Sequence, residues 1–222
     1  MNFKKGFTLS EVLITMTIIG VVAALSVPIL FADWHKTQTV SQLLKTHSTL
    51  SQTTYRAISD NGPIVSWSVD GITARDFYNV YLKPYLNIAN DDTNNEFKYT
   101  ALNNTQDSAS YGAVFYLADG QKISIKTPSN TAWGIEVGVV VDINGDKKPN
   151  RMGRDIFVFN YWMYHPITPE VSGKFIPWGA DWSREDIKNS SVSYACNKKK
   201  TGDICAALIA KDGWKISKDY PW

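Results

Sequence analysis

The sequence has few of the residues on which metal centres and nucleophilic active sites depend. Its 222 residues include two cysteines and three histidines, which leave few combinations for a His/Cys metal site or a Cys–His nucleophile. The G-x-S-x-G, H-E-x-x-H and P-loop motifs do not occur in it, and the histidines lie in unrelated contexts. The sequence therefore predicts that the protein is not an enzyme.

The chain also has little net charge. Its 23 basic and 21 acidic residues give a formal charge of +2, which argues against nucleic-acid binding through bulk charge, although a local basic patch stays open. Aromatic residues are plentiful, with 8 Trp, 11 Tyr and 9 Phe, and this excludes a disordered chain. The length fits one domain of ordinary size plus an appendage.

One long segment carries no charge at all. The 21 residues from Val12 to Ala32 are uncharged, and about 20 helical residues cross a bilayer core. Lys4 and Lys5 precede this run, so the positive-inside rule keeps the N-terminus in the cytoplasm. A cleaved secretory signal is one interpretation, but the apolar run continues past the small residues 22–24, where such a signal would be cut. A plain signal anchor is another, but it leaves unexplained Glu11, a costly carboxylate at the edge of the apolar segment.

The residues around Glu11 resemble a known signal. The sequence GFTLSE at residues 6–11, followed by an apolar helix, is similar to the class III signal of type IV prepilins and type II secretion pseudopilins. In that family a membrane-embedded peptidase cuts after the glycine and methylates the new N-terminal residue. The resemblance implies cleavage between Gly6 and Phe7, which removes the leader 1–6. Glu11 would then be the fifth mature residue and would pair with the N-terminal amine of a neighbouring subunit.

The resemblance also implies a fold, a location and partners. The expected fold is the α+β pilin fold, a long N-terminal helix packed on a C-terminal head with an antiparallel sheet of about four strands. The expected location is the bacterial inner membrane, crossed once, with the head extracytoplasmic, and afterwards the pseudopilus or pilus. The implied partners are the prepilin peptidase/methyltransferase, other pilin or pseudopilin subunits, the inner-membrane assembly platform and membrane lipid.

Hydrophobic periodicity predicts a similar organisation. Residues 7–32 form the membrane-spanning or filament-core helix, and 33–60 continue it with apolar residues three and four apart. The head is then 61–222, since Asn-Gly-Pro at 61–63 stops the helix. In the head the sequence predicts a helix at 70–86, a short strand at 97–101, and four strands at 113–117, 122–125, 134–142 and 155–164.

The loop 142–155 contains a candidate metal site. Asp142, Asn144 and Asp146 have the one-three-five oxygen spacing that opens an EF-hand, but Gly153 occupies the closing position, so this is not an EF-hand. The loop resembles instead the calcium loops of pseudopilins. The alternative is a turn whose acids are offset by neighbouring basic residues. The expected Ca²⁺ ligands are the side chains of Asp142, Asn144, Asp146 and Asp155 and the carbonyl of Lys148.

Two cysteines near the C-terminus predict a disulfide. Cys196 and Cys205 allow only one pairing, and the predicted topology places them outside the cytoplasm, where disulfides persist. Two free thiols are the alternative. Lys198–Lys200 lie inside the loop 196–205 and are either a solvated charge run or a contact for DNA or an anionic surface.

The predicted function is that of a structural pilin-like subunit. We expect a minor component of a type II secretion pseudopilus or a type IV pilus, because the head is larger than that of a compact major subunit. One alternative is a competence or adhesive pilin whose head binds DNA or a surface. The other is an exported enzyme held by a signal anchor.

Overall fold

The computed structural model describes residues 6–92, 96–110 and 112–222. The predicted leader, 1–6, lies outside these residues except for Gly6. The fold class is confirmed, because a long N-terminal helix is followed by a head built on an antiparallel sheet.

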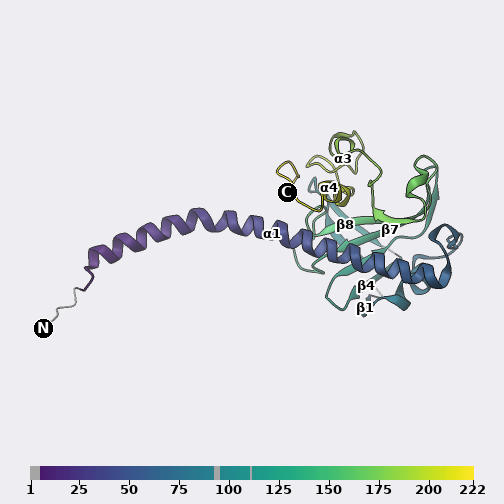
Figure 1. Ribbon diagram of the computed structural model, residues 1–222, viewed down its shortest axis with the longest axis horizontal. Helices are drawn as coiled ribbons and strands as arrows, with labels where there is room; N and C mark the ends of the chain where they lie inside the picture. Colours follow the sequence, from purple (N-terminus) through teal and green to yellow (C-terminus); the bar gives the residue numbers. More distant parts are fainter. Residues whose placement is uncertain (1–5, 93–95, 111) are drawn as a thin grey trace. The chain divides into compact units, whose positions relative to one another are not determined.

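Helix α1 (Leu9–Asn61) contributes to two compact units, Met1–Gln38 and Thr39–Trp222 (Figure 1). In the first unit, the large apolar side chains that the structure describes are exposed. Leu13 and Phe31, for example, are each 57% exposed. A helix that is apolar all round and exposed needs an apolar environment outside its own chain.

In the second unit, α1 becomes amphipathic and packs on the head. Leu43, Leu50 and Ala57 are completely buried at a spacing of seven residues, which keeps them on one face. The helix ends where the sequence predicts. Gly62 takes φ +80°, and its N–H donates to the carbonyl of Ile58 at 2.9 Å, an end that glycine allows because it has no Cβ.

The head is built on a seven-stranded sheet in which every pair is antiparallel. Its order is β1-β4-β5-β7-β8-β9, with β6 pairing with β7. The four predicted strands form its centre, and β7 and β8 lie side by side along their whole length (Figure 1). The strands are β1 (Ile88–Asp92), β4 (Ala113–Leu117), β5 (Lys122–Ile125), β6 (Ser129–Thr131), β7 (Gly134–Asp142), β8 (Ile156–Tyr164) and β9 (Lys174–Pro177).

The sheet is therefore larger than the four strands predicted from the sequence. Strands β1, with the sequence IANDD, and β6, with SNT, are mainly polar, and none of their residues is fully buried. Edge strands of this kind lack the apolar alternation by which a strand is recognised. Their positions are fixed by backbone pairing with β4 and β7.

Both faces of the central strands are buried. Val139 and Val141 lie in the main core with Leu50 of α1, whereas Val140 lies in a second cluster on the opposite face with Phe97. That second face is covered by a separate hairpin of β2 (Glu96–Thr100) and β3 (Gln106–Ser110). Burial on both faces explains the continuous apolar runs in β7 and β8.

Polar and aromatic contacts fix α1 on the sheet. The Thr46 hydroxyl donates to the Gln121 side chain at 2.5 Å in a buried position. A second buried hydrogen bond of 3.0 Å joins the hydroxyls of Thr54 and Tyr161. The His47 ring packs against the rings of Phe159, Phe175 and Trp214, so His47 is a packed, half-buried residue.

The single helix predicted for 70–86 is wrong in detail. Gly71 has φ +70°, and Thr73 and Asp76 form a capping box, so the helical segment begins only after Thr73. It then changes type twice, first to a π-turn and then to a 3₁₀ turn that contains Pro84. Proline does not fit the interior of a regular α-helix, because it has no N–H to donate. The pieces are α2 (Ala74–Phe77), a π-turn (Tyr78–Leu82) and a 3₁₀ turn (Lys83–Tyr85).

The C-terminal part of the head adds two short helices, α3 (Arg184–Asn189) and α4 (Cys205–Lys211). Arg184 links them to the end of the chain by donating to the carboxylates of Asp212 and Asp219. Two 3₁₀ turns, Ile64–Ser66 and Pro169–Val171, lie in the connections.

Candidate functional site

The N-terminal end of α1 is a capping box formed by Thr8 and Glu11. The Thr8 N–H and hydroxyl both donate to the Glu11 carboxylate, at 2.8 and 2.9 Å, and the Glu11 N–H donates back to the Thr8 hydroxyl at 3.2 Å. A carboxylate in the first turn also interacts favourably with the helix dipole. Within a single subunit, Glu11 therefore stabilises the start of its own helix.

The same helix is long and apolar enough to cross a membrane. An 18-residue window of α1 has a mean hydropathy of 2.4, and none of that window is buried in the protein. Phe7, directly before the helix, is 88% exposed. The side chains of this unit are thus free to contact lipid or other chains.

In the loop 142–155, oxygen atoms converge on the side chain of Asn144. Its amide oxygen lies 2.8 Å from the Asp142 carboxylate, 3.1 Å from the Gly145 carbonyl and 2.9 Å from the Lys147 carbonyl. Four oxygen atoms this close together repel one another unless a donor hydrogen or a cation lies between them. Either the amide is rotated so that its nitrogen donates, or a cation is bound by the oxygens.

Asp155 completes the same turn from the start of β8. Its carboxylate accepts hydrogen bonds from the N–H groups of Asn150 and Arg151 and from the Asn144 amide at 3.3 Å. Asp142 and Asp155 are only 2% and 3% exposed. Burial raises the pKa of Asp142 to about 8, with a contribution from the charges of Asp155 and Asp146, and burial also raises the pKa of Asp155.

The other two predicted ligands are placed differently. The Asp146 carboxylate accepts from the Tyr116 hydroxyl at 2.7 Å and from the Lys122 ammonium at 3.1 Å. The carbonyl that approaches Asn144 is that of Lys147, whereas Lys148 precedes a cis proline. In the described part of the chain, no three His, Cys, Asp or Glu side chains gather as a metal-binding group, so a cation here would depend on amide and carbonyl oxygens.

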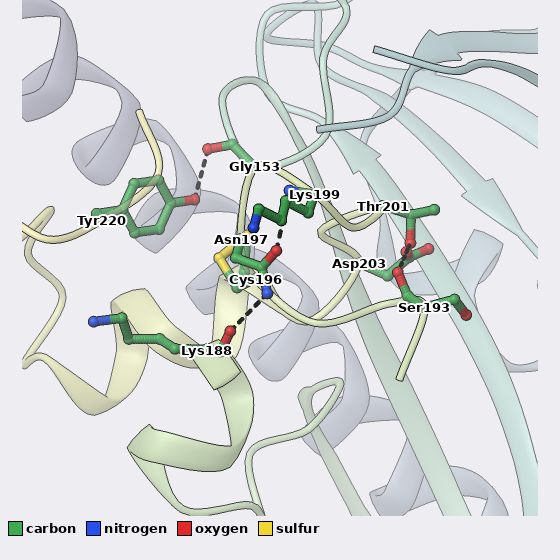
Figure 2. Close-up of a disulfide and its surroundings, with 10 residues drawn as sticks. Gly153, Lys188, Ser193, Cys196, Asn197, Lys199, Thr201, Asp203 and Tyr220 are labelled. Carbon is green, nitrogen blue, oxygen red and sulfur yellow. Dashed lines mark hydrogen bonds between the residues drawn. A yellow bond between two sulfur atoms is a disulfide. The ribbon is translucent and has the colours of Figure 1, made fainter. Parts of the chain in front are cut away.

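The disulfide predicted from the sequence is confirmed. Cys196 and Cys205 are bonded, with their Cα atoms 4.9 Å apart, and both are buried. Figure 2 shows the bond beside the loop 142–155, where the Tyr220 hydroxyl donates to the Gly153 carbonyl at 2.6 Å. Gly153 has φ +75°, and a Cβ there would lie 3.1 Å from the Cys205 sulfur, so the close approach requires glycine.

The three lysines of the disulfide loop differ from one another. Lys200 donates to the Ser191 carbonyl at 2.6 Å, whereas Lys198 and Lys199 are exposed. The Asn197 side chain fixes the loop by donating to the Lys188 carbonyl at 2.7 Å and accepting from the Lys199 N–H at 3.0 Å (Figure 2). The three lysines therefore do not form one uniformly solvated patch.

Among the described residues, Arg151 and Arg154 form no ion pair with the acids of the loop 142–155. Arg151 donates from its guanidinium to the Leu102 carbonyl at 2.8 Å and to the Asn104 side chain at 2.6 Å. The guanidinium of Arg154 lies over the Trp222 ring, 5.3 Å from its centroid. The sequence contains no signal for this, because the contacts join segments far apart in the chain.

Two family models match the chain. One, described as a family of unknown function (DUF6613), matches residues 29–222. The chain belongs to the DUF6613 family. The other, described as the prokaryotic N-terminal methylation motif, matches residues 1–27. Searches of curated proteins and of solved structures found no match.

The methylation motif gives this DUF6613 member a type IV prepilin-like class III signal peptide. It supports a pilin-like or pseudopilin subunit, a structural protein rather than an enzyme. Such a motif implies processing by prepilin peptidase and assembly with other pilins. Together with the apolar helix, it fits a pilin anchored in the inner membrane.

Proposed function

We propose that this DUF6613 member is a minor pilin-like subunit of a type II secretion pseudopilus or a type IV pilus. The observation that carries the proposal is the methylation motif on a helix that is exposed and apolar in one unit and packed on a folded head in the other. The N-terminus would be cytoplasmic and the head extracytoplasmic, as Lys4 and Lys5 before the apolar run indicate.

Processing would prepare the chain for assembly. Cleavage between Gly6 and Phe7 gives Phe7 a positively charged amine close to the helix start. In an apolar filament core that amine needs a counter-charge, and Glu11 of an incoming subunit supplies one. Because removing either charge leaves the other buried and unpaired, the pair selects one axial register. Packing between apolar helices then takes the place of the lipid that surrounds each subunit in the membrane.

Mass spectrometry of the protein purified from membranes tests this processing. We expect the mature chain to begin at Phe7 and to carry one added methyl group on that residue. The substitution Gly6→Leu should prevent the cut and leave the full-length mass, while Ser10→Ala serves as the control that is still cut. A wild-type chain that retains residues 1–6 would contradict the proposal.

We further propose that calcium stabilises the head at the loop 142–155. The oxygens around Asn144 and the two buried carboxyl groups of Asp142 and Asp155 support it, because a divalent cation would stabilise the ionised form of both groups. The carbonyls of Gly145 and Lys147 lie close enough to contribute. Asp146 would have to leave Lys122 to join them, and a flexible oxygen set suits Ca²⁺ better than Mg²⁺.

A second candidate function is a competence or adhesive pilin that captures DNA or a surface. The exposure of Lys198 and Lys199 on the loop closed by the disulfide favours it. A salt-dependent shift of DNA that disappears when Lys198, Lys199 and Lys200 are all replaced by glutamine would support this function.

A further inference from the structure

A small basic hollow lies on the head, outside the loop interior described above. Its volume is about 110 Å³, and its walls come from four segments of the chain that are far apart in sequence. Three of the lining side chains are cationic, namely Arg151, Arg154 and Lys198. Trp222 forms an aromatic wall, with the Arg154 guanidinium 5.3 Å from its ring centroid.

These three cations have no ion-pair partner among the residues that the structure describes. Other cations of the head do have partners. Arg184, for example, is paired with both Asp212 and Asp219. The acid beside Arg154 in sequence is Asp155, but its oxygens accept from backbone N–H groups and from Asn144. Among the described residues, no Asp or Glu side chain lines the hollow, so the three cations repel one another unless an anion joins them.

The hydrogen-bonding capacity of the two guanidinium groups is also incompletely used. Arg151 donates to the Leu102 carbonyl and the Asn104 side chain from one terminal nitrogen, and its buried Nε has no acceptor in the described part of the chain. The buried Nε of Arg154 likewise has none there. Buried donors of this kind normally have partners.

The walls are held in place before any ligand arrives. The Leu102 N–H donates to the Thr201 carbonyl at 2.9 Å, which ties one wall to the disulfide loop that carries Lys198. The Tyr220 hydroxyl donates to the Gly153 carbonyl at 2.6 Å, which ties the C-terminal wall to the arginine loop. A preformed site of this kind binds without the entropic cost of ordering its loops.

We propose that this hollow binds a single oxyanion group, a carboxylate or a phosphate. Guanidinium groups match the planar oxygens of both through paired hydrogen bonds. The volume corresponds to about three or four waters of liquid, which fits one such group and not a polymer segment. A nucleic-acid site needs a row of cations along a backbone, whereas here the cations surround one point. The site does not depend on the filament role proposed above.

The test is calorimetric titration of the full-length protein in detergent with sodium phosphate and, separately, with sodium acetate. Sodium chloride at the same ionic strength is the reference for salt effects. We expect saturable binding of at least one of the two anions and none of chloride. Whichever of phosphate and acetate binds more tightly identifies the oxyanion, and either preference supports the site.

Variants locate the binding. Arg154→Gln removes a charged donor and should weaken the bound anion about tenfold or more. Lys198→Gln, at an exposed position that cannot disturb the core, should weaken it several-fold. Lys199→Gln is the matched control, because this neighbouring lysine lies on the same loop but does not line the hollow, and its affinity should equal that of the wild type.

Three results would overturn the proposal. One is that neither anion binds saturably. The second is that Lys198→Gln and Arg154→Gln both bind as the wild type does, with circular dichroism showing that each is folded. The third is tight binding of a single-stranded oligonucleotide that Lys199→Gln weakens as much as Lys198→Gln, since an extended basic surface would then be responsible.

Discussion

Thr8 and Glu11 form a capping box at the N-terminal end of α1, in which the Glu11 carboxylate accepts two hydrogen bonds from Thr8, of 2.8 and 2.9 Å. One oxygen of the carboxylate proposed to pair with another subunit, Oε2, therefore already accepts both of these bonds in the single chain. In assembly, a charged amine would join these neutral donors at the carboxylate. The bonds from Thr8 already involve one charged partner, and an amine adds the second charge, which favours the assembled pair.

Glu11→Val removes the proposed inter-subunit pair and also the capping box with Thr8. We expect it to abolish filament assembly without preventing membrane insertion or processing, because the loss of a helix cap costs only about 1 kcal/mol. The measurement is the ratio of assembled to membrane-retained subunit after shearing and fractionation. Ser10→Ala, next to it in the chain, is the control and should assemble normally. Assembly of Glu11→Val at the wild-type level would refute the register argument.

Removal of calcium is expected to lower the melting temperature of the full-length protein in detergent. At calcium a hundredfold above its Kd, the difference should be roughly 5–10 °C for a chain of this size. Asp142→Asn should reduce the calcium response, while Asp70→Asn, at an exposed position, should leave it intact. An equal melting temperature with and without chelator would rule out the calcium site and favour the rotated Asn144 amide.

Replacing both cysteines by alanine is expected to reduce the free energy of unfolding by about 2–3 kcal/mol, because the closed loop no longer restricts the unfolded chain. Alanine is chosen because Cys196 and Cys205 are buried, where a serine hydroxyl would need a partner. Urea unfolding measures the change. A reductant should destabilise the wild type by a similar amount and leave the double variant unchanged, and a reductant effect on that variant would point to another cause.

His47 is expected to make the head less stable in acid. Burial lowers its pKa below the ordinary value of 6.5, so the folded state favours the neutral ring. The contribution of the neutral His47 ring to the free energy of unfolding is fully present above pH 6.5. It falls as the pH drops below that value and stops falling below the folded-state pKa. His47→Phe keeps the ring stacking on Phe159 and Phe175 without the titration.

The measurement for His47 is urea unfolding of both proteins between pH 7.5 and pH 5. The variant should gain stability relative to the wild type as the pH falls, while titrations elsewhere cancel in the comparison. A difference that does not change with pH would show that His47 is not the titrating group.

Local patterns determined much of this protein. A long run of uncharged, apolar residues predicted the exposed helix. The GFTLSE motif at 6–11 predicted the signal, and the family model of the N-terminal methylation motif matches it. Alternating and continuous apolar runs predicted the central strands β4, β5, β7 and β8. With only two cysteines, the sequence also allowed a single disulfide. Each of these predictions rests on residues that are neighbours in the sequence or on the number of cysteines.

The tertiary structure decided which side chains meet. It directed Asp146 to Lys122, which lies on β5, and left Asp142, Asn144 and Asp155 around one point. The physical reason is that the register of β5 on β7 places Lys122 opposite Asp142, next to the loop. No periodicity within the loop records that pairing.

The same holds for the basic hollow. Arg151 and Arg154 stand in the sequence as neighbours of acids, yet they lie with Lys198 and Trp222 because the disulfide loop and the C-terminal segment fold onto Leu102 and Gly153. The sequence by itself determined that a helix long and apolar enough to cross a membrane carries a folded head. Only long-range packing decided which oxygen atoms of the head lie close together in the loop 142–155 and which cationic side chains line the hollow.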